Sequence, residues 1–262
     1  MRDRIISAVV LIALFTLFYI LGGVYFVMLT SFASVLAYKE IAFLKKYPPV
    51  IIILGLVSII SLVILNSKEY IFTLGINTSS IIFPIIFLTL PTLIPRYQSK
   101  YEVSKAFEFI SFIFIIGLGI ASINSLMFSD KKLLLYVLSI CVLNDVFAYL
   151  IGTLIGKHKF SKISPKKSIE GLIAGSLVGT IGGTLFYVMF IEPTVNVLLI
   201  LAITFILNIS CQLGDLLFSK IKRENNIKDF SNLLPGHGGM LDRLDSIIIT
   251  SLVFVLLLSI FK

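Results

Sequence analysis

Residues 5–38 carry no Asp, Glu, Lys or Arg, and this uncharged run limits the possible folds more than any other feature of the chain. A helix that crosses the hydrocarbon core of a bilayer needs about 20 apolar residues, with a range of roughly 17–25. The run is too long for one such helix, so we divide it at Gly22-Gly23. The basic start, Met1–Arg4, leads into an apolar stretch longer than that of a signal peptide, so we expect a retained first span.

The composition of the whole chain indicates that lipid is its main solvent. Hydrophobic residues make up 58% of the 262 residues and charged residues 14%, whereas a soluble globular protein has about 45–50% and about 25%. We therefore predict an all-α polytopic integral membrane protein with about nine transmembrane helices. Their expected ranges are 5–21, 24–44, 50–66, 71–94, 105–124, 133–156, 169–191, 196–218 and 244–261.

The basic residues predict how these spans are oriented, because cytoplasmic loops of membrane proteins carry an excess of Lys and Arg. With the N-terminus in the cytoplasm, 18 of the 22 Lys and Arg residues fall on the inner side. The four on the outer side are Lys68, Lys131, Lys132 and Lys262. This asymmetry accounts for the net charge of +8 without a nucleic-acid partner.

We expect two regions along the chain. Residues 1–130 hold about five N-terminal spans, and residues 131–262 form a C-terminal catalytic region. The second region contains two long, basic inner loops, Lys157–Glu170 and Ser219–Arg243, which the predicted topology places on the cytoplasmic face of the cell (plasma or inner) membrane.

Acidic residues within predicted spans are the first candidates for a functional site. Asp145 is inside the range 133–156, and Asp215 is near the inner end of 196–218. Burying a charge at membrane depth is costly, so such a residue usually faces a cavity and has a function. For each of them, the alternative is a structural hydrogen bond or ion pair between helices.

The inner loop that starts at Ser219 carries residue types that bind phosphates and cations. If the eighth span continues as a helix, Asp215, Ser219 and either Lys222 or Arg223 share one face. Lysine and arginine side chains there would form an anion-binding pocket. The alternative is a solvated basic loop between two helices.

The end of the same loop adds acids and glycines. Asp242 and Asp245 are three residues apart at the start of the ninth span, so both can point the same way. Carboxylates gathered by adjacent helices suit a hard divalent cation, usually Mg²⁺ together with a phosphate substrate. The glycines around His237 let the backbone approach a ligand closely, and their N–H groups could hold phosphate oxygens.

In order, the loop reads Ser219-x2-Lys222-Arg223-x4-Lys228-Asp229-x5-Pro235-x-His237-Gly238-Gly239-x2-Asp242-Arg243-x-Asp245. This long pattern closely resembles the signature of the phosphatidate cytidylyltransferases, also called CDP-diglyceride synthases. Two upstream segments, Asn144–His158 and Ser164–Gly171, resemble further parts of that family, with Ser168 where the family often has Thr. The likeness is specific over residues 144–246 and only general over 1–130.

The resemblance implies a membrane nucleotidyltransferase of phospholipid biosynthesis that converts CTP and phosphatidic acid to CDP-diacylglycerol and pyrophosphate. It implies Mg²⁺ as the cofactor, with a second cation in a dinuclear site, membrane lipids as surroundings and a homodimer. The implied metal ligands are Asp215, Asp242 and Asp245. The other residues expected to act in catalysis are Lys222, Arg223, Arg243 and His237. Those expected to bind substrate are Ser219, Gly238, Gly239, Lys166, Lys167, Lys228 and Asp145.

Three other readings use some of the same features. A CTP-dependent enzyme that phosphorylates a polyprenol or activates an archaeal ether lipid would have similar basic loops. A CDP-alcohol phosphotransferase also uses spaced aspartates, but the chain lacks the D-G-x-x-A-R…G-x3-D-x3-D pattern. A secondary transporter would spread polar groups through the bilayer, whereas here they concentrate at one predicted face.

Overall fold

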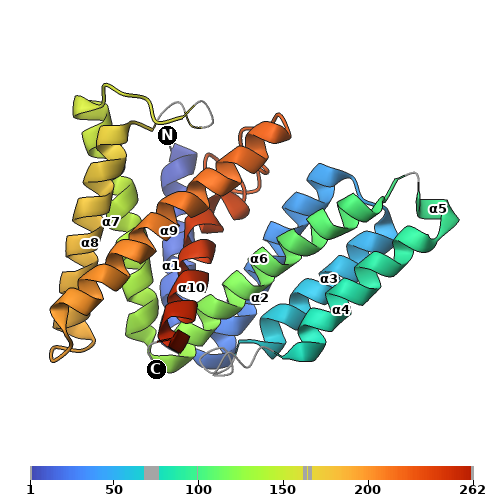
Figure 1. Ribbon diagram of the computed structural model, residues 1–262, viewed down its shortest axis with the longest axis horizontal. Coiled ribbons are helices and arrows are strands. Elements are labelled where there is room, and N and C mark those ends of the chain that lie inside the picture. Colours follow the sequence, from blue (N-terminus) through green and yellow to red (C-terminus); the bar gives the residue numbers. More distant parts are fainter. Residues whose placement is uncertain (1, 68–76, 99, 162–163, 165–166, 261–262) are drawn as a thin grey trace. The chain divides into compact units, whose positions relative to one another are not determined.

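The computed structural model describes residues 2–67, 77–98, 100–161, 164 and 167–260 (Figure 1). Within this part of the chain the regular structure is helical, apart from two isolated β-bridges, Lys159 with Ser168 and Leu234 with Gly238. The prediction of an all-α protein is therefore confirmed. The chain packs into two compact units.

The first unit comprises Met1–Phe128 together with the segment Asp229–Arg243. Its helices are α1 (Arg2–Leu21), α2 (Gly23–Lys45), α3 (Pro49–Leu65), α4 (Thr78–Thr89), η2 (Leu90–Leu93), α5 (Pro95–Gln98) and α6 (Val103–Ser129). The second unit comprises Ser129–Lys228 and Leu244–Lys262. It contains α7 (Lys131–Ile155), α8 (Ile169–Phe190), α9 (Val197–Glu224) and most of α10 (Leu241–Ile260).

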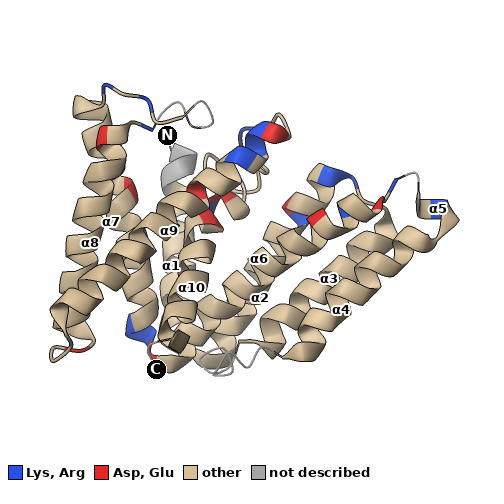
Figure 2. Cartoon of the chain, in the orientation of Figure 1, with Lys and Arg blue, Asp and Glu red and all other residues tan. Residues whose placement is uncertain are grey.

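Among the described helices, six are long and apolar enough to cross a membrane, namely α2 and α6 to α10. Three shorter apolar helical stretches, Ile6–Leu21, Pro49–Leu65 and Thr78–Leu93, fall at other predicted spans. A polytopic membrane protein agrees with this pattern. Figure 2 shows charged residues mainly near the helix ends, while the long middle stretches are almost free of them.

Local chemistry explains several helix boundaries. The uncharged run breaks where we divided it, because Gly22 has a φ of 65°, in the left-handed region that favours glycine. Pro84 lies inside α4, and Pro91 lies in the 3-10 segment that follows, so the predicted span 71–94 is uneven in its described part. Its first residues, 71–76, lie outside the described residues.

The first unit is held together by close contacts between its helices. Thr30 donates to Asn124 Oδ1 at 2.7 Å, and the Asn124 side chain donates to Ser67 at 2.8 Å, which links α2, α6 and the end of α3. Gly55 of α3 leaves room for the Tyr38 hydroxyl, because a Cβ there would lie 2.6 Å from it. Such polar and small-residue contacts are typical of helices packed within a bilayer.

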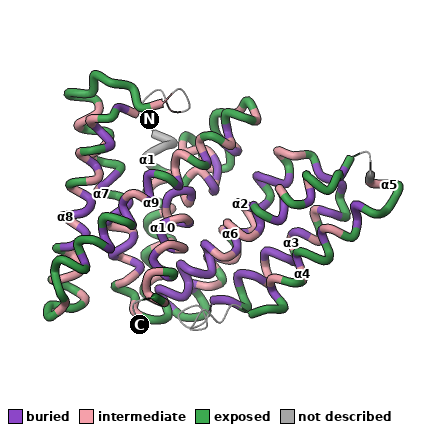
Figure 3. The backbone as a smooth tube through the Cα atoms, viewed as in Figure 1, coloured by how far each residue is buried: buried purple, intermediate pink, exposed green. Residues whose placement is uncertain are grey.

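Large apolar side chains remain exposed on the outer faces of the helices. Leu154 of α7 and Leu198 of α9 are each 76% exposed. Figure 3 shows buried and exposed stretches alternating along the long helices. A soluble monomer rarely leaves so many apolar side chains in water, so these faces fit contact with lipid tails.

Candidate active site

The segment between α9 and α10 folds back on itself at its glycines. Gly236 and Gly238 have φ values of 75° and 86°, which residues with a Cβ rarely adopt. The N–H groups of His237 and Gly238 both donate to the Leu234 carbonyl, at 2.8 and 3.1 Å. These bonds make a tight turn over Pro235 and Gly236, and His237 stands where the turn closes.

Asp242 lies in the first helical turn of α10, and its carboxylate stabilises the loop that contains His237. Its Oδ2 accepts hydrogen bonds from the backbone N–H groups of Phe230 and Gly239, both at 2.9 Å. Arg243 donates from Nε and a guanidinium nitrogen to the His237 carbonyl, at 2.9 and 2.5 Å. Two residues predicted to act on substrate therefore also shape the loop, and the N–H of Gly239 already has a protein acceptor.

The imidazole of His237 has a partner from the start of the chain. Ser7 Oγ of α1 lies 2.7 Å from His237 Nδ1 and donates to the Pro235 carbonyl at 3.1 Å. A partner on Nδ1 fixes the orientation of the ring, and with it the direction of the other ring nitrogen. The sequence offered no signal for Ser7, which is one of many hydroxyls in apolar runs.

Sequence reasoning also missed Glu40, near the C-terminal end of α2. Its side chain is buried, and it accepts hydrogen bonds from Ser231 Oγ at 2.6 Å, Met240 N at 2.8 Å and Leu241 N at 2.9 Å. Hydrogen bonds to a charged acceptor are worth about 1.5–3 kcal/mol each. A signal was present, since Glu40 is an acid within the predicted span 24–44.

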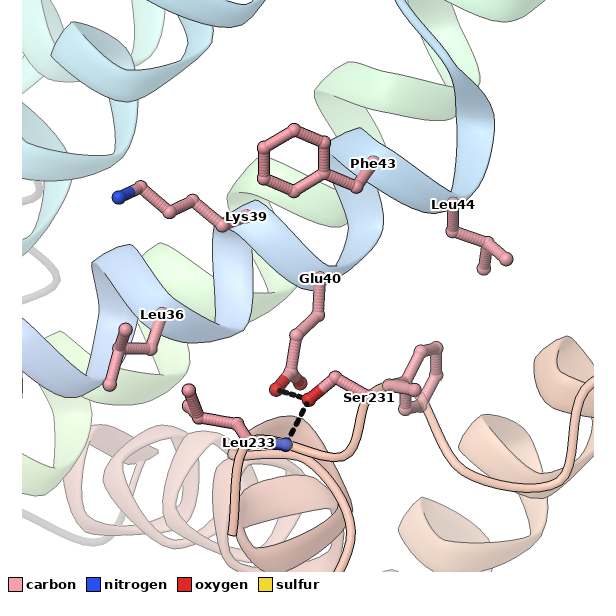
Figure 4. Close-up of a pocket in the computed structure, with 8 residues that line it drawn as sticks. Leu36, Lys39, Glu40, Phe43, Leu44, Ser231 and Leu233 are labelled. Atoms are coloured by element: carbon pink, nitrogen blue, oxygen red, sulfur yellow. Dashed lines mark hydrogen bonds between the residues drawn. The ribbon is translucent and has the colours of Figure 1, made fainter.

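A cavity of about 490 Å³ lies beside these bonds (Figure 4). Glu40 and Ser231 meet at one wall of it, and Lys39 extends away from the Glu40 carboxylate. The rest of the lining is mainly apolar, from Leu36, Phe43, Leu44, Phe230 and Leu233.

In the second unit, Asp215 of α9 is the centre of a second polar group. Its carboxylate forms an ion pair with Lys167, the residue before the N-cap of α8, and Ser219 Oγ donates to Asp215 Oδ1 at 3.4 Å. The eighth predicted span continues as a helix to Glu224, so Asp215 and Ser219 share one face as the spacing predicts. Lys222 follows on the same helix and is buried.

Asp245 and Asp145 complete the acidic groups of this unit. Asp245 is 8% exposed and its Oδ1 accepts from the backbone N–H of Ser246 at 2.7 Å. Asp145 Oδ1 accepts from the Asn144 side chain at 3.0 Å. Each of the two carboxylates lies within electrostatic range of Asp215, with Lys222 near Asp245 and Lys167 near Asp145.

A buried amide network positions α7 and α9, which carry Asp145 and Asp215. The Gln212 side chain donates to Asn144 Oδ1 at 2.8 Å, to the Leu172 carbonyl at 3.0 Å and to Ser176 Oγ at 2.9 Å. It thereby ties α9 to both α7 and α8. Gly175 lets these helices approach, because a Cβ there would lie 2.7 Å from the Asn144 carbonyl.

The remaining predicted site residues are Arg223, Lys228 and Lys166. Arg223 is exposed and donates to the Ile227 carbonyl at 3.0 Å, and Lys228 is exposed. Lys166 lies outside the described residues. His158, which closes the upstream family-like segment, pairs with Glu170 at 2.6 Å.

The donor chemistry of the second unit suits a hard cation, because Asp145, Asp215 and Asp245 offer carboxylate oxygens, the ligands that Mg²⁺ prefers. Within the described residues, however, no group of three or more His, Cys, Asp or Glu side chains is gathered closely enough to hold a metal ion. Asp215 is paired with Lys167 instead. The side chains are therefore of the kind that binds Mg²⁺, while the Asp215 carboxylate is occupied by its ion pair with Lys167.

Comparisons with known proteins extend over nearly the whole chain. A sequence model described as the cytidylyltransferase family matches residues 2–261. Proteins named phosphatidate cytidylyltransferase from Staphylococcus haemolyticus and Staphylococcus aureus are each 30% identical over 249 residues, which cover 94% of this chain and 94% of each relative. One of the same name from Staphylococcus epidermidis is 29% identical over 251 residues, again 94% of both chains.

Proposed function

The chain belongs to the cytidylyltransferase family, and we propose that it transfers the cytidylyl group of CTP to phosphatidic acid, which makes CDP-diacylglycerol and pyrophosphate for phospholipid biosynthesis. The observation that carries this proposal is the match to relatives named phosphatidate cytidylyltransferase over 94% of both chains. The acids, bases and glycines of the signature lie where the described helices end, which suits a water-soluble nucleotide and a lipid substrate.

The chemistry requires positioning and charge neutralisation more than proton transfer. A phosphate oxygen of phosphatidic acid attacks the α-phosphorus of CTP, and the bond from that phosphorus to the bridging oxygen of the β-phosphate breaks. The electron pair leaves with pyrophosphate. Because the attacking oxygen is already anionic near neutral pH, no strong general base is needed.

Basic groups of the signature neutralise the phosphates. In the second unit, Lys167 pairs with Asp215 and can exchange that partner for a phosphate oxygen. Lys222 acts electrostatically on Asp245 and adds a second positive charge. Ser219 offers a hydroxyl on the same face of α9 as Asp215. Arg223, Lys228 and the undescribed Lys166 add positive charge that attracts CTP.

In the first unit, the turn around His237 supplies a different surface. His237 is held by Ser7 through Nδ1. Gly238 carries no side chain, which lets phosphate oxygens approach this turn, whereas Gly239 faces the Glu40 carboxylate. Arg243 braces the turn through the His237 carbonyl and adds a cation beside it.

We assign the magnesium site to Asp215 and Asp245, with Asp145 nearby, and Asp242 to a further ligand position from its place in the signature. When bound, Mg²⁺ would neutralise charge on the triphosphate, and a second cation in a dinuclear site would do the same. The support is the chemistry of the donors and the electrostatic proximity of the three acids in the second unit.

For the topology, we propose nine crossings with the N-terminus and the signature in the cytoplasm. In support, six described helices are long and apolar enough to cross a membrane and three shorter apolar helical stretches fall at other predicted spans. With nine crossings, 18 of the 22 basic residues lie inside. CTP is a cytoplasmic nucleotide, and phosphatidic acid would enter from the inner leaflet. We also propose that residues 131–262 form the catalytic region. We propose that the protein is a homodimer.

The proposal is tested with purified chain, CTP, phosphatidic acid and magnesium, by following pyrophosphate release. Release that depends on phosphatidic acid supports it. Release without phosphatidic acid, or turnover of a polyprenol in its place, would contradict it.

A further inference from the structure

Glu40 lies far from the family signature in sequence, yet its carboxylate is directed at the signature loop. Among residues of the first unit whose side chains are described, Glu40 is the buried acid, with 7% of its surface exposed. Its three hydrogen-bond donors are Ser231 and the backbone N–H groups of Met240 and Leu241. The loop is therefore tied to α2 at both its start and its end.

We propose that Glu40 is a positioning residue for nucleotidyl transfer: it holds the loop between Ser231 and Leu241 in the conformation in which His237, Asp242 and Arg243 act. The inference rests on the proposed function. Glu40 itself contacts neither CTP nor phosphatidic acid, and it acts through the backbone of the loop.

The geometry requires a carboxylate and not only a polar side chain. Glu40 Oε1 accepts from Ser231 and Met240, while Oε2 accepts from Leu241. A glutamine would place an NH₂ donor against one of these donors, so at least one bond would be replaced by a repulsive contact. An alanine would leave two backbone N–H groups without this acceptor at the start of α10.

Gly239 gives an independent indication that the Glu40 contact is close. A Cβ on Gly239 would lie 2.6 Å from both carboxylate oxygens of Glu40. Unlike Gly236 and Gly238, Gly239 is not among the glycines with positive φ. The requirement for glycine at position 239 therefore comes from the Glu40 carboxylate and not from the backbone conformation.

The hydrogen bonds from Met240 and Leu241 to Glu40 lie next to the residues proposed to act in catalysis. The N–H of Gly239 donates to Asp242, the N–H groups of Met240 and Leu241 donate to Glu40, and Arg243 donates to the His237 carbonyl. Releasing Met240 and Leu241 would let this whole turn shift. A displacement of about 1 Å at such a position can cost up to roughly 100-fold in rate.

The first experiment compares purified full-length Glu40→Gln with wild type and with Glu102→Gln, a matched change at an exposed acid of the same unit. Rates are measured against CTP and phosphatidic acid and divided by the amount of folded protein. We expect kcat/KM for CTP to fall about tenfold in Glu40→Gln, while the KM for phosphatidic acid and all constants of Glu102→Gln stay within about twofold. Unchanged kinetic constants in folded Glu40→Gln overturn the proposal.

If Glu40→Gln does not fold, Ser231→Ala decides, because it removes one donor and leaves the carboxylate in place. A smaller fall in kcat/KM for CTP supports the proposal, and wild-type kinetics overturn it. Turnover by the wild-type protein in the same assay tests the proposed function separately. A failure of the proposed function is therefore distinguishable from a failure of the proposed role of Glu40.

The second experiment uses Gly239→Ala alone and together with Glu40→Ala. The single Gly239→Ala variant should be strongly impaired, because its methyl group meets the carboxylate. With the carboxylate removed, the added methyl group should cost no further activity beyond that of Glu40→Ala. An additional loss as large as that in the wild-type background would overturn the proposed reason for Gly239.

A third readout needs no activity. Hydrogen exchange at the Met240 and Leu241 amides should be slow in wild type and at least about tenfold faster in Glu40→Gln, with exchange in the middle of α6 unchanged. Equal protection of these two amides in both proteins would overturn the proposal that Glu40 holds the loop.

Discussion

Lys167 forms an ion pair with Asp215, so the residue before the N-cap of α8 reaches the candidate metal ligand on α9. The two side chains are 23% and 28% exposed, which leaves them open to ions and solvent. A lysine held beside a candidate metal ligand is placed to take up a phosphate when the pair opens.

Replacing Lys167 with Met should therefore weaken CTP binding. We expect the KM for CTP to rise about tenfold, which corresponds to roughly 1.4 kcal/mol of lost interaction. Lys220→Met is the matched control, because Lys220 forms an exposed i,i+4 pair with Glu224 and lies outside the candidate site. Steady-state kinetics against CTP check the prediction, and an unchanged KM in Lys167→Met would remove Lys167 from the phosphate site.

Asp242 has a structural and a proposed chemical role, and two substitutions separate them. Asp242→Asn keeps an oxygen that can accept from Phe230 and Gly239, so it should fold normally while losing turnover by about 100-fold or more. Asp242→Ala removes that acceptor and should also lose about 1–3 kcal/mol of stability.

Thermal unfolding and turnover of both variants check this prediction. Asp130→Asn is the control, because Asp130 also accepts from a backbone N–H, at the N-cap of α7, and has no proposed catalytic role. Wild-type turnover in Asp242→Asn would show that Asp242 only shapes the loop.

Close packing of α7 against α8 should make Gly175 sensitive to substitution. In Gly175→Ala the new methyl group meets the Asn144 carbonyl, which cannot move without shifting the helix. We expect a loss of about 1–3 kcal/mol. Gly182→Ala meets only the end of the flexible Leu143 side chain and should cost less. Unfolding in detergent measures both, and equal stabilities would show that α7 and α8 adapt.

The proposed orientation can be measured with introduced cysteines, since native Cys141 and Cys211 are buried. Thr194→Cys, in the exposed turn between α8 and α9, should react with a membrane-impermeant maleimide from outside the cell. Glu224→Cys, at the end of α9, should react only after the membrane is opened. The reverse pattern would place the signature on the outer face.

Much of the fold could be predicted because the apolar runs and the breaks between them are local properties of the sequence. Gly22 divides the first run, and α9 continues past the predicted span so that Ser219 reaches Asp215. Glu40 and Ser7 were missed because their partners are about 190 and 230 residues away along the chain. No local pattern predicts a contact at that separation, and only the packing of the first unit brings these side chains to the loop.

The same limit applies to the glycines of the signature. The sequence predicted that Gly239 lets a ligand approach, whereas the structure shows the Glu40 carboxylate against it. A glycine pattern indicates close approach, but it does not say which group approaches.

The most direct measurement follows the fate of each CTP phosphate. Purified protein receives phosphatidic acid, magnesium and CTP labelled either at the α-phosphate or at the γ-phosphate, with Asp215→Asn assayed in parallel. We predict that the α-label enters the lipid and that the γ-label leaves as pyrophosphate. The Asp215→Asn variant should neither label the lipid nor release pyrophosphate. Appearance of γ-label in the lipid, or no transfer by correctly folded wild-type protein, would contradict nucleotidyl transfer to phosphatidic acid.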